Sequence, residues 1–243
     1  MNKNNIWFIT TKTNMHVGNE NTTSYGLIDL AVQRNATTGL PCINSSSLKG
    51  ALNEFAVQEA KIESADLIEI FGCDKGMENG KRRNSDTKKG RYTFFDANIL
   101  FLPVQDDKTL YHLETSHDVI GRFRKQMALF GIQLNQDDEA LKEELKKNLA
   151  IDKEVRFSDS DEKFIELCSD DNLPIIARNV LENGESKNLW YEQVVPAETV
   201  FYTIIDDKGD GILANKIVGD KAIVQIGANA TIGYGYCKFT NLK

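Results

Sequence analysis

The spacing of hydrophobic residues near the start of the chain predicts a strand followed by a helix. Positions 6–17 (IWFITTKTNMHV) are rich in β-branched and aromatic residues, which is typical of a strand. Positions 45–59 begin with three serines and then place apolar side chains at intervals of three and four, at Leu48, Leu52 and Phe55. We therefore expect an amphipathic helix there, capped at its start by the serine run.

The middle of the chain contains three further periodic segments. Positions 91–104 (RYTFFDANILFLPV) form an apolar run that predicts a core strand ended by Pro103. Positions 118–132 repeat apolar residues with helical spacing and predict a core helix. Positions 138–149 place leucines on one stripe, with acidic residues early and lysines late, which predicts a surface helix.

The second half of the chain contains a hairpin signal. Extended runs at 173–179 and 189–195 enclose the pair Asn183-Gly184. Because Asn-Gly between two extended runs favours a two-residue turn, we expect a β-hairpin that protrudes from the fold.

The last segments complete a mixed pattern of helices and strands. Extended runs lie at 199–205, 222–226 and 233–239, with a cluster of glycines between the last two. Helices and strands do not alternate strictly, which favours an α+β fold with an antiparallel or mixed sheet, and a ferredoxin-like (RRM-like) core fits this order. We predict a single domain over 1–243 with three insertions: a basic loop at about 72–91, a helical insertion at about 133–172 and the hairpin at about 177–192.

Composition adds limits on the class of protein. The 243 residues are 41% hydrophobic, enough for a core. No apolar run approaches the roughly 18 residues of a membrane helix, and the start of the chain does not match a signal peptide. The four cysteines are far apart and show no metal-ligand spacing, so we expect a cytoplasmic protein without a disulfide framework or zinc site.

The net charge of −7 normally argues against a nucleic-acid binder. The charge is distributed unevenly, however. Positions 75–91 contain seven basic residues and two acidic ones, in a segment without apolar periodicity that predicts a surface loop. The total charge therefore does not exclude RNA as a partner.

Individual residues indicate binding chemistry only weakly. Lys49 lies in the first turn of the predicted helix, where free N–H groups favour a phosphate, although a solvated lysine is the simpler interpretation. The glycines at 227–235 would let backbone approach a ligand closely, or would simply form a tight hairpin. The chain lacks the P-loop pattern and the strand and helix context of a dinucleotide-binding motif.

Candidate catalytic groups are also weak when taken alone. Asp29 is a loop carboxylate of the kind that can hold hydrated Mg²⁺, with His16 upstream, yet most loop aspartates are merely solvated. The serines at 45–47 lack the G-x-S-x-G pattern, so a serine nucleophile is not expected.

The order of these pieces is more specific than any one of them. The N-terminal blocks at 15–18 (MHVG), 25–34 (YGLIDLAVQR) and 38–52 (TGLPCINSSSLKGAL) resemble the RAMP superfamily of CRISPR–Cas proteins. Later blocks resemble the repeated backbone subunit of type III-B (Cmr) effector complexes: 71–72 (FG), 95–104 (FDANILFLPV), 177–179 (ARN), 188–192 (NLWYE), 195–196 (VP) and 225–235 (QIGANATIGYG). The chain departs from the family pattern at Asn44 and Ser45, which replace a Pro-Gly pair, and at Ala228, which replaces a glycine.

The resemblance implies a fold and a set of partners. The family has a ferredoxin-like core with inserted fingers and a thumb hairpin, which would fall at 177–192. Its members assemble head to tail along a CRISPR guide RNA, pair with complementary target RNA, join other Cmr subunits and act in antiviral defence. The RNA-binding residues implied here are Ser46, Ser47, Lys49, Arg178, Asn179, Gly227, Asn229, Thr231, Gly233 and Tyr234.

The resemblance also implies an endoribonuclease. Asp29 matches the catalytic aspartate and would hold Mg²⁺, while the neighbouring 2′-hydroxyl of the target RNA attacks the phosphate at six-nucleotide intervals. His16 and Glu192 fall in family-like blocks and are implied as accessory catalytic residues. Two alternatives stay open, a non-catalytic guide-binding scaffold and the equivalent type III-A backbone subunit. A solitary RRM is disfavoured because the aromatic strand motifs of that domain are absent.

Overall fold

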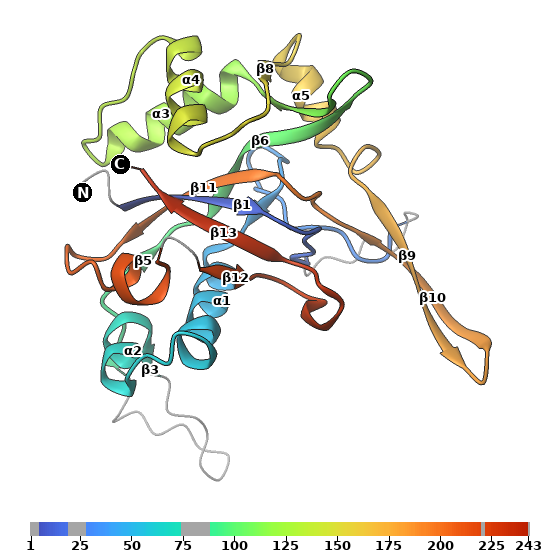
Figure 1. Ribbon diagram of the computed structural model, residues 1–243, viewed down its shortest axis with the longest axis horizontal. Helices are drawn as coiled ribbons and strands as arrows, with labels where there is room; N and C mark the ends of the chain where they lie inside the picture. Colours follow the sequence, from blue (N-terminus) through green and yellow to red (C-terminus); the bar gives the residue numbers. More distant parts are fainter. Residues whose placement is uncertain (1–4, 19–27, 74–87, 220–221, 243) are drawn as a thin grey trace.

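A mixed nine-stranded sheet forms the centre of the protein (Figure 1). The structure is a computed structural model that describes residues 5–18, 28–73, 88–219 and 222–242. The strands of the sheet are β1 (Ile6–Thr11), β2 (Cys42–Ile43), β5 (Thr93–Phe94), β6 (Ala97–Asp106), β7 (Leu110–Thr115), β8 (Val155–Phe157), β11 (Val200–Asp206), β12 (Ile223–Gln225) and β13 (Tyr236–Asn241). Its main path is β12-β13-β1-β11-β6-β7-β8, with β2 beside β6 and β5 beside β11. Within this described sheet β7 and β8 pair in parallel and the other strand pairs are antiparallel, so the predicted α+β class with a mixed sheet is confirmed.

Helices and two smaller strand pairs surround this sheet. The helices are α1 (Ser45–Gln58), α2 (Ser64–Phe71), α3 (His117–Leu129), α4 (Asp138–Asn148) and α5 (Asp161–Leu167). The strand pairs are β3 (Gly72–Cys73) with β4 (Lys88–Lys89) and β9 (Ile175–Glu182) with β10 (Glu185–Gln193). Of the predicted basic loop, positions 74–87 lie outside the described residues.

Strand β1 lies between β11 and β13 and is almost fully buried. Phe8 pairs with Tyr202 across β11, and the ring of Phe123 from α3 packs against both. Aromatic side chains bury large apolar areas, so this contact fixes α3 on the sheet. The predicted helix at 118–132 is therefore confirmed as a core element.

Strand β1 ends earlier than the sequence pattern predicts. It stops at Thr11, and the following residues cross to other segments, where Met15 forms a bridge with Val195 and Gly18 one with Val32. The expected strand over 6–17 is thus wrong beyond Thr11, because the β-branched composition does not reveal a change of pairing partner. This crossing brings His16 to the base of the β9–β10 hairpin.

Helix α1 begins where the sequence predicts, but its capping differs. Asn44 is the N-cap residue and makes no side-chain cap bond, while the serines lie inside the first turn. The Ser45 N–H instead donates to Asp96 Oδ1 at 2.7 Å. Asp96 also marks the break between β5 and β6, so the single strand expected at 91–104 is two strands. A remote carboxylate therefore does the capping that was assigned to the serine run.

The β9–β10 hairpin is present as the Asn-Gly signal predicts. Asn183 and Gly184 have φ values of 52° and 84°, as a type I′ turn requires. The hairpin projects well beyond the rest of the protein (Figure 1). Beyond its base, where Leu30 bridges to Glu192, its two strands pair with each other in the described structure, and Val180, Leu181 and Leu189 are exposed.

The glycine-rich segment joins β12 to β13 through a longer loop than a tight hairpin. The loop spans 226–235 and contains a 3₁₀ turn at Ala230–Ile232. Gly235 has a φ of +77°, and a Cβ there would lie 2.0 Å from the carbonyl oxygen of Ile226. Only glycine fits this position.

Burial leaves Cys42, Cys168 and Cys237 unreactive. Cys42, Cys168 and Cys237 are free and buried. Burial raises the pKa of the Cys42 thiol to about 11 and the pKa values of Cys168 and Cys237 to about 12, so these thiols stay protonated near neutral pH. In the described ranges, no helix has the length and apolar character needed to cross a bilayer.

We predict that Gly235→Ala destabilises the protein by at least about 2 kcal/mol, because it combines a left-handed backbone with a backbone clash. Gly121→Ala is the matched control, since a Cβ at this α3 position meets nothing within 4 Å. It should be neutral or stabilising by up to about 1 kcal/mol. Urea unfolding of both variants measures the difference, and equal stabilities would contradict this account of the loop.

Candidate functional site

Asp29 lies on an exposed segment that pairs with the end of β10. Its N–H donates to the carbonyl oxygen of Tyr191 at 3.0 Å, and Leu30 forms a parallel bridge with Glu192. One carboxylate oxygen of Asp29, Oδ2, accepts the N–H of Tyr191 at 2.7 Å. Within the described residues, Oδ1 accepts no hydrogen bond, so half of this exposed carboxylate is available to a ligand.

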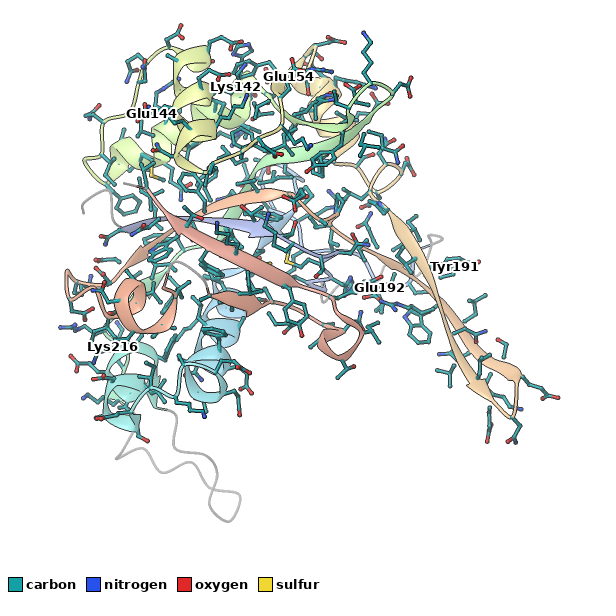
Figure 2. All side chains as sticks on the ribbon, viewed as in Figure 1. Lys142, Glu144, Glu154, Tyr191, Glu192 and Lys216 are labelled. Carbon is teal, nitrogen blue, oxygen red and sulfur yellow. The ribbon has the colours of Figure 1, made fainter. Side chains whose placement is uncertain are left out.

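A buried carboxylate lies one residue from this anchor. Glu192 is 2% exposed, and Figure 2 shows it with Tyr191 where the hairpin leaves the core. Its Oε2 accepts from Arg178 Nε at 3.0 Å, and its Oε1 accepts from Asn229 Nδ2 at 2.5 Å. Buried charges are stable only when they are paired and hydrogen-bonded, and both oxygens of Glu192 meet that requirement.

His16 completes this arrangement and is itself buried at 4% exposure. Its Nδ1 lies 2.7 Å from the carbonyl oxygen of Gln193 and 3.5 Å from Glu192 Oε1. Since both neighbours only accept, Nδ1 carries a proton and donates to the carbonyl. The imidazole therefore ties the segment after β1 to the end of β10.

Arg178 connects the hairpin to the glycine-rich loop. Its guanidinium carbon lies 4.6 Å from the ring centre of Tyr234, a cation–π distance, while Nε holds Glu192. We call His16, Arg178, Glu192, Asn229 and Tyr234 the Glu192 cluster. In it, three segments that are distant in sequence share one buried ion pair. Arg178 Nη2 is buried without a hydrogen-bond partner in the described structure.

The glycine-rich loop is held against the same segment by its backbone. Gly227 has a φ of +88°, and a Cβ there would lie 2.2 Å from the carbonyl oxygen of His16. The N–H of Ala228 donates to that same oxygen at 2.9 Å. The loop therefore needs glycine at 227 to approach His16 this closely, while Thr231 and Gly233 remain exposed on its outer side.

A groove of about 610 Å³ separates the glycine-rich loop from helix α1. Ser47 and Gly50 line its α1 side, and Gln225 and Gly227 line the other side. Gln33 spans the groove's edge, because its Nε2 donates to Ser47 Oγ and its Oε1 accepts the N–H of Asn44. From the sequence alone Gln33 has no predicted role, although this residue lies in the family-like block at 25–34.

The charge in this groove is not uniform. The first-turn N–H groups of α1 favour an anion at one end, although Asp96 already takes the Ser45 N–H, and Lys49 is not among the residues that line the groove. Glu54 and Glu59 line the groove on the same helix further along. The preference for phosphate is therefore confined to the N-terminal end of α1.

The structure brings together some of the predicted site residues and separates others. His16, Glu192, Arg178, Asn229 and Tyr234 form the Glu192 cluster, and Asp29 lies beside it. Ser46 and Lys49 belong to α1 and make no contact with the cluster, and Asn179 accepts from Ser186 Oγ on the hairpin's exposed part. The predicted roles of these residues in catalysis and RNA binding remain predictions.

The described residues do not form a cage for a resident metal ion. They contain no group of three or more His, Cys, Asp or Glu side chains that could hold one. Glu192 is committed to its cluster, so Asp29 offers a single carboxylate oxygen. Such a donor fits only an ion that keeps waters and takes its remaining ligands from substrate phosphates.

These features place the chain in a known family. The model of the RAMP superfamily matches residues 8–238, so the chain belongs to this superfamily. Among curated proteins, it is 26% identical over 272 aligned positions to the CRISPR system Cmr endoribonuclease Cmr4 of Pyrococcus furiosus, covering 90% of this chain and 89% of that protein. The predicted resemblance to the RAMP superfamily is confirmed.

Solved structures agree with this assignment at the level of the fold. A type III-B Cmr-beta structure in the apo state has a TM-score of 0.72 at 20% identity and covers 98% of this chain and 96% of that chain. The oligomeric Cmr4 of Pyrococcus furiosus has a TM-score of 0.69 at 23% identity, with coverages of 97% and 96%. A type III-B Cmr-beta structure bound to cognate target RNA also has a TM-score of 0.69, at 20% identity, with coverages of 97% and 95%.

We predict that Glu192→Ala destabilises the protein by about 3 kcal/mol or more, because it leaves the Arg178 guanidinium largely buried without its carboxylate. Glu185→Gln is the control on the same hairpin, since its pair with Lys187 is exposed and should contribute at most about 1 kcal/mol. Urea unfolding compares the two variants. A similar small loss for both would show that the Glu192 cluster does not stabilise the hairpin base.

Proposed function

We propose that this chain is the repeated backbone subunit of a type III-B CRISPR effector complex and the endoribonuclease that cuts its target RNA. The observation that supports this most directly is the carboxylate of Asp29, of which only Oδ2 is hydrogen-bonded within the described residues. It lies at the base of a protruding hairpin and beside the Glu192 cluster. The similarity to a protein named a Cmr endoribonuclease supports the activity. The similarity to structures of a target-bound complex and of an oligomer supports RNA, further copies and other Cmr subunits as partners.

In this proposal the guide RNA follows the groove between α1 and the glycine-rich loop. Lys49 and the first turn of α1 bind a guide phosphate, with Ser46 and Ser47 as hydroxyl donors. The loop presents Gly227, Asn229, Thr231, Gly233 and Tyr234, whose backbone lies against the RNA. Each copy covers only a short RNA segment, so a net charge of −7 is compatible with binding through a local basic end.

The hairpin corresponds to the thumb of the family, the core to its ferredoxin-like palm and the insertions to its fingers. Val180 and Leu181 near the tip are exposed and apolar, which suits a wedge that pushes one base pair out of the guide–target stack. Arg178 lies near its base and Asn179 lies on its exposed part, where each would meet a phosphate. One hairpin and one Asp29 per copy would then give cuts at six-nucleotide intervals along the target.

The chemistry proposed at Asp29 is an internal transesterification. The 2′-hydroxyl oxygen attacks the adjacent phosphorus, and the bond to the 5′ oxygen breaks, giving a 2′,3′-cyclic phosphate and a 5′-hydroxyl end. Asp29 Oδ1 accepts the proton of the attacking hydroxyl, while the Tyr191 N–H holds Oδ2 and so orients the carboxylate. Water supplies the proton to the leaving oxygen.

Magnesium is proposed as the accompanying ion, with Asp29 as its protein ligand. Asp29 would hold the ion through one of its bound waters, and Mg²⁺ would offset the negative charge that develops on the phosphate oxygens. For His16 and Glu192 we propose a role different from that of the accessory catalytic residues that the resemblance implies. Both are buried and satisfied within the Glu192 cluster, so we propose that they position the strand that carries Tyr191 and thereby Asp29.

We predict that Asp29→Asn slows target cleavage by the assembled complex by about 100-fold or more while guide and target binding persist. Asparagine retains an oxygen for the Tyr191 N–H, so the variant removes the charge and not the anchor. Asp152→Asn, an exposed position in the helical insertion, is the matched control and should cut at the normal rate.

The readout is the length of end-labelled target fragments with Mg²⁺, together with gel-shift measurement of binding. A target carrying a single 2′-deoxy nucleotide at one cut position should lose only that cut. Unchanged cutting by Asp29→Asn would favour the alternative of a non-catalytic scaffold. The large subunit that co-purifies with the chain distinguishes a type III-B complex from the type III-A alternative.

We also predict that Lys49→Gln weakens guide RNA binding and lowers the slope of log affinity against log salt by about one, because one phosphate contact is lost. Lys108→Gln, on the exposed turn between β6 and β7, should change neither quantity. Fluorescence anisotropy with a labelled guide at several salt concentrations measures both. Equal slopes for the two variants would remove Lys49 from the guide site.

A further inference from the structure

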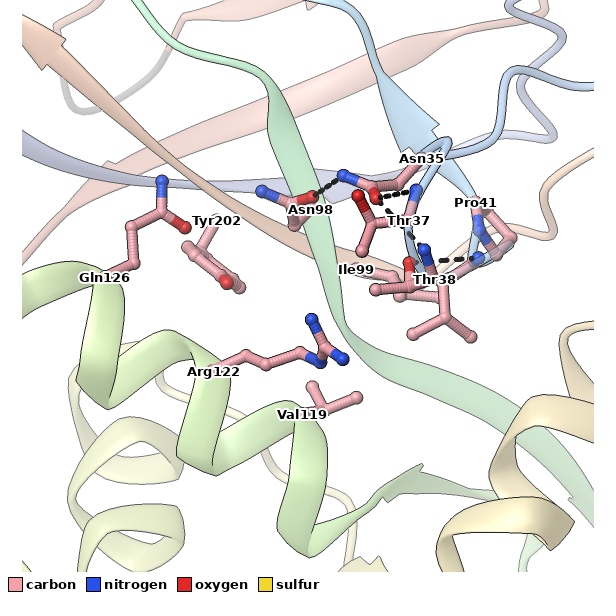
Figure 3. Close-up of a pocket in the computed structure, with 11 residues that line it drawn as sticks. Asn35, Thr37, Thr38, Pro41, Asn98, Ile99, Val119, Arg122, Gln126 and Tyr202 are labelled. Atoms are coloured by element: carbon pink, nitrogen blue, oxygen red, sulfur yellow. Dashed lines mark hydrogen bonds between the residues drawn. The ribbon is translucent and has the colours of Figure 1, made fainter.

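A second cavity lies away from the groove and shares no lining residue with it. Its volume is about 250 Å³, and it is formed where α3, β6 and β11 meet the loop before β2 (Figure 3). Ligand pockets in proteins commonly measure roughly 300–1,000 Å³, so this cavity admits a small molecule and not a polymer. Neither the RNA partners nor the catalytic proposal uses it.

Tyr202 supplies an unpartnered polar group to this cavity. The residue is 3% exposed, and its ring packs edge-on against Phe123 with 4.7 Å between the ring centres. No group in the described ranges hydrogen-bonds to its hydroxyl, whose end of the ring faces the cavity in Figure 3. Burial raises the pKa of this phenol, so it stays neutral and keeps a proton to donate. The hydroxyl opens onto the cavity, where it can donate to a ligand.

Arg122 brings a positive charge to the same space. It projects from α3 toward the cavity, and no carboxylate among the described residues pairs with it. Arg124, one half-turn along the same helix, is by contrast held by Asp138. The guanidinium of Arg122 is therefore available for an anion.

The remaining polar groups are also mainly donors. Asn35 Nδ2 donates to Asn98 Oδ1 at 3.2 Å, which leaves Asn98 Nδ2 without an acceptor in the described part of the chain. Asn35 Oδ1 accepts the backbone N–H of Thr37 at 3.0 Å, so the loop is fixed and the Thr37 hydroxyl borders the cavity. None of the lining residues is acidic, although the chain as a whole carries a net charge of −7.

We propose that this cavity binds the phosphate group of a small phosphorylated ligand of up to mononucleotide size. The donors come from four separate elements and surround the space, which suits the tetrahedral oxygens of a phosphate better than a planar carboxylate. Arg122 supplies the charge and two or more N–H donors, and Tyr202 and Asn98 supply neutral donors from the sheet. The amide of Gln126 at the rim can bond the rest of such a ligand.

Isothermal titration of the purified, nucleic-acid-free full chain tests this with three probes, which are AMP, inorganic phosphate and adenosine. We expect saturable AMP binding with a Kd below about 1 mM. Arg122→Gln should weaken it by about tenfold or more, and Tyr202→Phe, which keeps the buried ring, by about threefold or more. Lys125→Gln removes an exposed positive charge from the same helix outside the cavity and should leave the affinity unchanged.

The probes also distinguish the sources of the phosphate. Inorganic phosphate that binds as tightly as AMP supports a site for free phosphate, whereas AMP that binds about tenfold more tightly supports a nucleotide site. Equal binding of adenosine and AMP would overturn the proposal, because the phosphate would then contribute nothing. No saturation by AMP or phosphate up to about 10 mM, or unchanged affinity in Arg122→Gln, would overturn it as well. Arg122 is exposed on its helix, so this variant keeps the test decisive even if Tyr202→Phe is unstable.

Discussion

One buried carboxylate constrains the geometry of this protein more than any other group. Glu192 is removed from water, and an isolated ionised carboxylate in that environment costs many kcal/mol. It is tolerated because Arg178, Asn229 and His16 meet it from separate parts of the chain. The direction of the hairpin, the position of the glycine-rich loop and the crossing after β1 therefore cannot be changed independently.

The position of the exposed Asp29 depends on the buried Glu192 through the backbone of β10. Asp29 has no side-chain partner in the core, and its position is set by hydrogen bonds to Tyr191, the residue before Glu192. Strand β10 carries both the buried Glu192 and the backbone of Tyr191 that contacts Asp29. A rigid strand of this kind can fix the position of Asp29 without a second hydrogen-bond partner for its carboxylate. One acid, Glu192, therefore holds the scaffold, while the other, Asp29, stays exposed at the surface.

Much of the fold was predictable because its signals are local. The Asn183-Gly184 turn and helix α1 follow from short-range periodicity and backbone preference, and both are present. The capping of α1 by Asp96 and the early end of β1 were not predictable, because they depend on contacts between segments that are remote in sequence. The burial of Glu192 and His16 likewise could not be read from residue type, since a Glu in an alternating strand is expected to face solvent.

In the proposed assembly, the projecting hairpin would link the stability of a single subunit to the binding of its neighbours. Two strands without a third are marginally stable in water, and Val180, Leu181 and Leu189 stay about half exposed or more. Contact with a neighbouring copy or a nucleic-acid duplex would bury these side chains. A hairpin ordered in this way would lose less conformational entropy when the next partner binds. Each added subunit would thereby help to order the β9–β10 hairpin of the preceding subunit. Growth of the proposed polymer should then be cooperative even where the direct contacts between subunit cores are weak.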